Sequence, residues 1–229
     1  YQYKEEGLEK VNANFSLPNT IFSLAVAENN DLFIGGDSGL FRVTYQNGIL
    51  KLKRKIASSE VRLIARTTSG DFLINVVDDL LNSTIFKLEN GELTRLKELD
   101  NKWLSWAYEI TEGEFLLGTR NGLYKWSNSD LKLLGRELGL SNEFFMDFTE
   151  DNGRLLMITE GKGMSVYDIS KDSVFVHNRN TGFTIKSPTG VTLDSENGVW
   201  FSSMSGLYRV SHDELIRNIS ARDSLQNVE

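Results

Sequence analysis

Two tryptophans stand close together near the middle of the chain, in the segment Lys102-Trp103-Leu104-Ser105-Trp106. An indole ring offers a flat apolar face together with one N–H donor, so an exposed tryptophan can stack on a sugar ring or on a peptide. We expect one of the two rings to pack in the core. Trp103 and Trp106 are therefore candidate ligand-binding residues, and Trp103 is the candidate for a platform that faces a ligand.

Two loops carry polar side chains that suit binding. Asp78 and Asp79 belong to an insertion, residues 78–83, which departs from the regular pattern described below. Binding residues concentrate on loops of this kind, although a tolerated insertion explains the same segment. Arg120 and Asn121 lie on the corresponding loop of the next copy of the pattern. We expect these two side chains to converge with the insertion on one face.

Residues for nucleophilic or metal chemistry are scarce. The only histidines are His177 and His212, and neither has a second histidine or a cysteine at metal-ligand spacing. The chain has no cysteine, which excludes thiol catalysis, disulfides and thiolate metal sites. It also has no Gly-x-Ser-x-Gly nucleophile motif. We therefore expect no catalytic residue, no metal and no cofactor, and we interpret both histidines as surface or half-buried polar residues.

A phrase of the type Gly-Leu-aromatic-basic recurs along the chain at intervals of roughly 40 residues or twice that. The clear copies are Gly39-Leu40-Phe41-Arg42, Gly122-Leu123-Tyr124-Lys125 and Gly206-Leu207-Tyr208-Arg209. The weaker copies are Thr84-Ile85-Phe86-Lys87 and Gly163-Met164-Ser165-Val166. A repeat of this length, with several short strands in each copy, is typical of a β-propeller in which each copy forms one blade.

Each copy contains four short apolar or alternating runs, which in the first copy are Ile21–Val26, Leu32–Gly36, Gly39–Val43 and Ile49–Lys53. Asn, Asp and Gly separate the runs, and these residues accept the positive φ of tight hairpins, so consecutive runs should pair as an antiparallel meander. We predict an all-β propeller of about five four-stranded antiparallel blades. The blades are expected at residues 15–55, 56–100, 101–140, 141–185 and 186–222 of one array, 1–229.

Composition narrows the classes of partner. The formal net charge is −7 and the pI is about 5.1, which disfavours nucleic acid because phosphate binding needs a basic surface. No run approaches the roughly 20 apolar residues of a membrane-spanning helix. We therefore expect no nucleic-acid partner, and contact with a membrane only through segments absent from this chain.

The repeated unit resembles the two-component regulator propeller repeat. The resemblance spans roughly residues 8–217 and is strongest in three stretches, which read NDLFIGGDSGLFR (30–42), GEFLLGTRNGLYK (113–125) and NGVWFSSMSGLYR (197–209). Such repeats form the extracytoplasmic sensor of bacterial hybrid histidine kinases and propeller-bearing diguanylate cyclases. The resemblance implies a propeller that binds a ligand, in several cases a glycan fragment, without catalysis. Sensors of this family usually have more than five blades, which favours part of a larger propeller over a closed five-bladed ring.

We expect the chain to be a non-catalytic ligand-sensing domain of such a receptor, on the periplasmic side of the bacterial inner membrane. A small-molecule or glycan-like ligand and a homodimer are the expected partners. Two alternatives stay open. One is a protein-interaction scaffold, which the sequence does not separate from a sensor. The other is a propeller lyase or hydrolase, which the mostly apolar starts of the first strands disfavour.

Overall fold

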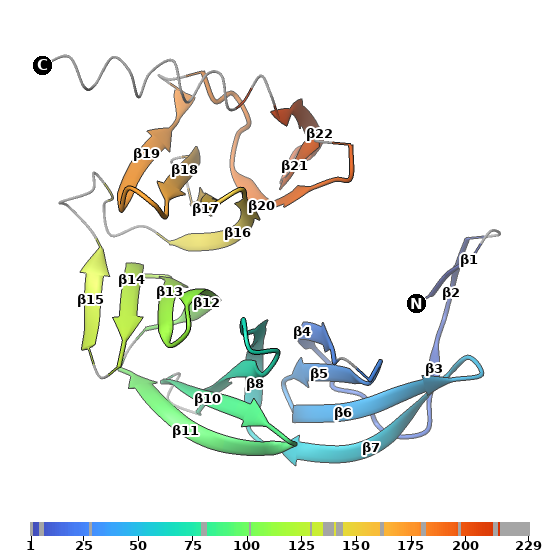
Figure 1. The fold of residues 1–229 in the computed structure, drawn as a ribbon. Coiled ribbons are helices and arrows are strands. Elements are labelled where there is room, and N and C mark those ends of the chain that lie inside the picture. Colours follow the sequence, from blue (N-terminus) through green and yellow to red (C-terminus); the bar gives the residue numbers. More distant parts are fainter. Residues whose placement is uncertain are drawn as a thin grey trace, which may run out of the picture. The chain divides into compact units, whose positions relative to one another are not determined.

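The computed structural model describes residues 2–4, 7–27, 29–78, 82–100, 102–128, 130–134, 140, 144–160, 163–179, 182–196, 198–212 and 215. These residues form β-strands almost throughout, joined by tight turns (Figure 1). The chain divides into two compact units, Tyr1–Trp103 and Leu104–Glu229. Within the described part of the chain, no helix is long and apolar enough to cross a membrane.

The first unit contains two large sheets. The first sheet is built from β4 (Ile21–Val26), β5 (Leu32–Gly36), β6 (Gly39–Gln46) and β7 (Ile49–Ala57), and the short β3 (Asn12–Ala13) pairs in parallel with β7 at its edge. The second sheet is built from β8 (Glu60–Arg66), β9 (Phe72–Val77), β10 (Ser83–Glu89) and β11 (Glu92–Leu99). A separate hairpin pairs β1 (Gln2–Lys4) with β2 (Gly7–Glu9).

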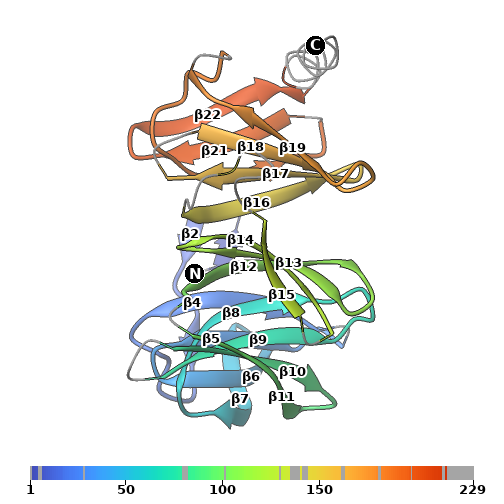
Figure 2. The same ribbon diagram turned by 90° about the vertical axis from the view of Figure 1, so that its left-hand side faces the viewer.

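The described residues of the second unit form three sheets. The third sheet of the chain is built from β12 (Leu104–Thr111), β13 (Glu114–Thr119), β14 (Gly122–Ser127) and β15 (Asp130–Leu134). The fourth is built from β16 (Phe145–Asp151), β17 (Arg154–Thr159), β18 (Gly163–Asp168) and β19 (Ser173–His177), which follow one another in chain order (Figure 2). The fifth is built from β20 (Pro188–Leu193), β21 (Gly198–Ser203) and β22 (Gly206–Ser211).

The predicted all-β propeller fold is confirmed, because each copy of the repeat forms one antiparallel meander in chain order. The last copy differs from the predicted four-stranded pattern, in which a fourth strand would follow β22. Leu215 lies in a helical turn and packs in the core between the fourth and fifth sheets, and residues 216–219 lie outside the described part. A short apolar run fits a strand and a helix equally well, so its pattern alone does not separate the two.

The glycine that opens each Gly-Leu-aromatic-basic phrase is explained by the backbone. Gly39, Gly122, Gly163 and Gly206 have φ values of 129°, 127°, 98° and 143°, which side-chain-bearing residues rarely adopt. A Cβ atom on Gly39 would also lie 2.0 Å from the Ala57 carbonyl oxygen. Four of the five copies therefore have glycine at the start of the third strand because φ is positive there, and at Gly39 close packing against Ala57 is a second reason.

The basic residue of the phrase is held by an acidic side chain at the turn between the first two strands of the same sheet. Such a pair fixes the edge of the meander through charge-assisted hydrogen bonds. The fourth sheet has Val166 at the basic position and instead pairs Arg154 with Asp168 at 3.8 Å. In the other sheets the pairs are Arg42–Asp31 at 2.7 Å, Lys87–Asp71 at 2.9 Å, Lys125–Glu114 at 2.9 Å and Arg209–Asp194 at 2.8 Å.

Asp31 is the most buried of these acids, with 1% of its surface exposed. Its carboxylate accepts hydrogen bonds from Arg42 Nε at 2.7 Å, Lys53 Nζ at 2.6 Å and Asn29 Nδ2 at 3.0 Å. Burial by itself raises the pKa of Asp31, but the hydrogen bonds from Lys53, Arg42 and Asn29 together outweigh it and hold the pKa below its ordinary value.

The lowered pKa of Asp31 predicts an acid-sensitive contribution to stability. A depressed carboxyl pKa stabilises the fold above the unfolded pKa of about 4, and the stability is lost as the pH falls through the folded pKa. In urea unfolding at pH 7 and pH 3, Asp31→Asn should lose less stability on acidification than the parent protein. Glu92→Gln, at an exposed ion pair with Arg54, should behave like the parent. An equal acid loss in Asp31→Asn and the parent would contradict this assignment.

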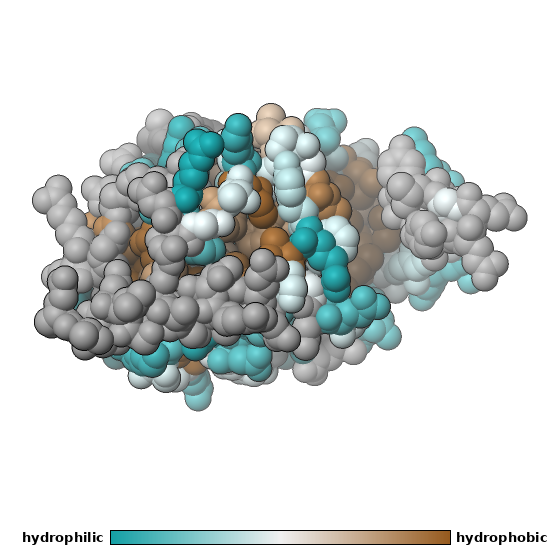
Figure 3. Space-filling view, turned by 90° about the horizontal axis from the view of Figure 1, so that it is seen from above, coloured by the Kyte–Doolittle hydropathy of each residue, from teal (hydrophilic) through white to brown (hydrophobic). Residues whose placement is uncertain are grey.

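Apolar side chains fill the spaces between neighbouring sheets within each unit. In the first unit Phe33 and Leu40 of the first sheet pack against Val61, Ile64 and Phe72 of the second sheet. Apolar side chains also reach the surface, since Leu24 is 63% exposed and Met204 is 87% exposed. Figure 3 shows brown apolar surface lying between teal hydrophilic side chains. The molecule thus has an apolar core and also apolar surface available for contacts.

The first strand of every large sheet carries a bulge at the same place. Its pairing with the second strand shifts by one residue just after the strand begins, in β4, β8, β12, β16 and β20 alike. Bulges leave one residue unpaired and re-aim its side chain. The residues passed over are Phe22, Arg62, Ser105, Met146 and Thr189.

Candidate functional site

An arginine that lies over two aromatic rings forms the candidate site, in the first unit. The Arg62 Cζ atom lies 3.7 Å from the ring centroid of Trp103 and 5.4 Å from that of Phe22. Phe22 is 42% exposed and Trp103 is 37% exposed. We call Phe22, Arg62 and Trp103 the aromatic–arginine stack. Two large aromatic rings at the surface, held by a shared cation, are a feature suited to recognition.

The bulges explain how the stack is assembled. Phe22 and Arg62 are the bulged residues of β4 and β8, the first strands of two neighbouring sheets. The residue after the first bulge ties the two strands together, because Ser23 Oγ accepts a hydrogen bond of 3.0 Å from the Ile64 backbone N–H. Trp103 comes from the segment between β11 and β12. Three separate segments of the chain therefore contribute one ring or guanidinium each.

An acidic side chain completes the site. Arg62 Nε donates a hydrogen bond to Glu60 Oε1, at the start of the same strand. The guanidinium is thus held by the Glu60 carboxylate at its Nε atom and by cation–π contacts with the two aromatic rings. The site offers apolar ring surface together with a donor-rich guanidinium and an acceptor carboxylate. Such a combination can bind a ring that bears hydroxyl or amide groups.

The structure separates the two predicted tryptophans. Trp106 is only 3% exposed, and its ring lies 4.6 Å from that of Phe148 and 6.5 Å from that of Phe145, measured between centroids. A Cβ atom on Gly118 would lie 2.0 Å from the Trp106 ring, so Gly118 leaves the space that the indole occupies. Trp106 is a core residue, and Trp103 is the surface tryptophan of the pair.

The other predicted site residues lie at turns. Asp78 follows β9 and is exposed, and its carboxylate accepts hydrogen bonds from the backbone and side chain of Asn82 at 2.8 and 3.1 Å. Asp79 lies outside the described residues. Arg120 and Asn121 form the exposed turn between β13 and β14, where the Asn121 N–H donates to Thr119 Oγ1 at 3.1 Å. Because Asp78 belongs to the first unit and this turn to the second, their convergence on one face stays a prediction.

Sequence reasoning missed Phe22, Arg62 and Glu60 as site residues. A bulge leaves no mark in the pattern of apolar residues, and Ile21-Phe22 and Val61-Arg62 read as ordinary strand beginnings. The signal that could have identified Arg62 is the repeat itself. Once the five first strands are aligned, Arg62 stands out as the charged residue at a position that is otherwise apolar or small.

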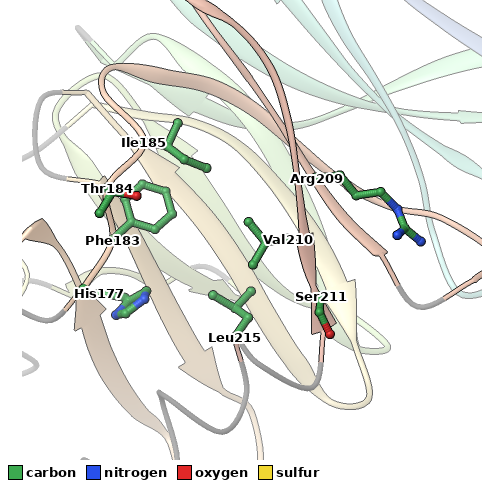
Figure 4. Close-up of a pocket in the computed structure, with 9 residues that line it drawn as sticks. His177, Phe183, Thr184, Ile185, Arg209, Val210, Ser211 and Leu215 are labelled. Atoms are coloured by element: carbon green, nitrogen blue, oxygen red, sulfur yellow. The ribbon is translucent and has the colours of Figure 1, made fainter.

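A cavity of about 300 Å³ lies in the second unit, between the end of β19, residues 182–185, the end of β22 and Leu215 (Figure 4). The side chains of His177, Phe183 and Leu215 gather on one side of it, while the guanidinium of Arg209 points away from them. His177 is 2% exposed and its ring lies 5.7 Å from that of Phe183. His177 is thus more buried than the sequence suggested, and it packs against apolar side chains of the core.

The second histidine forms a polar pair. His212 Nε2 lies 2.7 Å from Asp151 Oδ2, which links the segment after β22 to the end of β16 in the fourth sheet. The two histidines therefore have separate structural surroundings. Among the described residues there is no group of three or more His, Cys, Asp or Glu side chains that could hold a metal ion.

Comparison with known proteins supports the fold. The sequence matches no protein-family model and no curated protein. Among solved structures, the chain resembles the extracellular domains of a hybrid two-component system and of a one-component system, both from B. thetaiotaomicron. The TM-scores are 0.65 and 0.64, the sequence identities 20% and 17%, and each match covers 86% of this chain and 28% of the other.

An enzyme shares the same architecture. A gluconolactonase from Xanthomonas campestris matches with a TM-score of 0.58 and 15% identity over 82% of this chain and 71% of its own. At such identities these likenesses show the fold alone. This chain spans little more than a quarter of the length of the two extracellular domains, 28% in each case.

Proposed function

We propose that this chain is a non-catalytic ligand-sensing propeller domain of a bacterial membrane signal-transduction receptor, placed on the extracytoplasmic side of the membrane. The observation that carries the proposal is the aromatic–arginine stack, whose two aromatic rings are exposed at the surface. The likeness to extracellular domains of bacterial signalling systems supports the setting. The resemblance of the repeat to two-component regulator propellers supports both the ligand-sensing role and the extracytoplasmic setting.

The chemistry of the stack favours a glycan fragment or a small ring-bearing molecule as ligand. A sugar ring has an apolar face that can lie on an indole or a phenyl ring, and its hydroxyl groups can accept from Arg62 and donate to Glu60. Arg62 holds both rings before the ligand arrives, so little side-chain freedom would be lost on binding. The site is therefore pre-organised for a flat, hydroxylated ligand.

Binding would signal through a shift in population. A ligand that binds one arrangement of a receptor dimer more tightly than the other favours that arrangement, by no more than the difference in its two affinities. The propeller itself needs no chemical step for this. A homodimer of the receptor and its membrane-bound segments belong to this proposal.

The test is titration of the chain with a panel of oligosaccharides, first on an array and then by calorimetry. We expect at least one oligosaccharide to bind with saturation. Trp103→Ala and Phe22→Ala should each weaken that binding about tenfold or more, since aromatic anchors dominate recognition. Tyr45→Ala is the matched control, because Tyr45 is an aromatic residue of the same unit with the same 37% exposure as Trp103.

Two results would count against the proposal. One is a bound oligosaccharide whose affinity is unchanged in both stack variants. The other is the absence of binding across the panel by a protein that melts cooperatively. In the second case a protein partner becomes the preferred ligand, because tryptophan and arginine are also the residues that anchor protein interfaces.

A further inference from the structure

A cavity of about 370 Å³ lies in the first unit, at the end of the first and second sheets that carries the β4–β5, β8–β9 and β10–β11 turns. It is distinct from the aromatic–arginine stack, because the two share no lining residue. At roughly 30 Å³ for each water molecule, the cavity has room for a small organic molecule. We call it the turn cavity.

The floor of the turn cavity is apolar. Phe33, Phe72 and Leu88 line it, and all three side chains are almost fully buried. The rings of Phe33 and Phe72 meet edge to face with centroids 5.1 Å apart, which is a stable aromatic geometry. This floor favours an aliphatic group of a ligand, and it contributes little binding free energy to a purely polar ligand.

Charged groups of opposite sign line the same cavity. Arg42 belongs to a cluster in which Arg42 and Lys53 both bind Asp31, so the cluster carries one net positive charge. Asp71 belongs to a cluster in which Lys87 lies 2.9 Å from Asp71 and 3.5 Å from Glu89, so this cluster carries one net negative charge. The turn cavity therefore has a positive side at Arg42 and a negative side at Asp71.

We propose that the turn cavity binds a zwitterion, namely a free α-amino acid with an aliphatic side chain. The ligand carboxylate accepts hydrogen bonds from the guanidinium of Arg42, whose Nε and Nη2 atoms also face Asp31. The ligand ammonium donates to Asp71, and the aliphatic side chain lies on Phe33 and Phe72. A ligand with only one of the two charges would leave one side of the cavity without its counter-charge.

The test is calorimetric titration of the whole chain with L-leucine, isocaproate and isoamylamine. Isocaproate is leucine without its ammonium group, and isoamylamine is leucine without its carboxylate. We expect saturable binding of L-leucine and at least tenfold weaker binding of either analogue. Arg42→Gln and Asp71→Asn should each weaken L-leucine binding at least tenfold.

A second kind of variant keeps the test decisive if a charge substitution disturbs the fold. Ala27 lines the turn cavity, so Ala27→Phe should block L-leucine while both charged clusters stay in place. Trp103→Ala should leave L-leucine binding unchanged, which separates this proposal from the one on the stack. No saturable heat from L-leucine up to about 10 mM, or equal binding of leucine and its analogues, would overturn the proposal.

Discussion

Replacing Trp106 by alanine is expected to lower the free energy of unfolding by about 3–5 kcal/mol, the range for large aromatic side chains removed from a core. The indole is buried against Phe145 and Phe148, and it fills the space that Gly118 leaves open. Its removal creates a cavity between the third and fourth sheets that the neighbouring backbone cannot close. Urea unfolding followed by circular dichroism measures this loss.

Trp103→Ala is the matched comparison, because it removes the same side chain three positions earlier. Trp103 is partly exposed and forms a cation–π pair with Arg62, so we expect a loss of about 1 kcal/mol or less. Equal losses in the two variants would show that the division into a core tryptophan and a surface tryptophan is wrong.

Gly39→Ala is expected to destabilise the first unit by several kcal/mol. The position has a φ of 129°, which costs an alanine about 1–3 kcal/mol. The new Cβ would also lie 2.0 Å from the Ala57 carbonyl oxygen, and backbone cannot move away as a flexible side chain can. Overpacking of this kind adds about 1–3 kcal/mol. The midpoint of urea unfolding is the measurement.

Gly206→Ala separates the two causes. Gly206 opens the same phrase in the fifth sheet with a φ of 143°, but a Cβ there would meet no atom of the described residues within 4 Å. This variant should therefore show only the cost of strain, about 1–3 kcal/mol, and less than Gly39→Ala. If Gly206→Ala were as destabilising as Gly39→Ala, backbone conformation alone would explain the recurring glycine and the contact with Ala57 would contribute nothing.

The repeat is the part of the structure that the sequence predicts well. Glycine at Gly39, Gly122 and Gly206 marks the start of the third strand, because only glycine suits that φ. The turns at Asn47-Gly48 and Asn90-Gly91 fall where hairpins require positive φ. These are local requirements of the backbone, and local requirements can be read from neighbouring residues.

The candidate site depends on contacts between distant residues and was only partly predictable. Trp103 was identified because an indole is informative by itself, but its partner Arg62 comes from another strand. Pairing in the sheet decides which residue is passed over at a bulge, and the sequence around Phe22 or Arg62 does not reveal it. Likewise, the space at Gly118 that makes Trp106 a core residue depends on the register of β12 and β13.

The turn cavity likewise could not be predicted from the sequence. Arg42 and Asp71 belong to different copies of the repeat, so the pattern of a single copy does not bring them together. The two clusters have opposite net charges because Lys53 belongs to the cluster of Arg42 and Glu89 belongs to the cluster of Asp71. Charge balance at such a place depends on three-dimensional neighbours, so composition and spacing do not predict it.

The most direct test of the central claim is a nuclear magnetic resonance titration of the indole N–H signals. The chain has four tryptophans, and each signal can be assigned from a single Trp→Phe variant. On addition of the tightest oligosaccharide from the panel, the signal of Trp103 should shift with saturation while that of the buried Trp106 stays in place. Saturable binding that leaves the Trp103 signal unmoved would contradict the assignment of the aromatic–arginine stack as the ligand site.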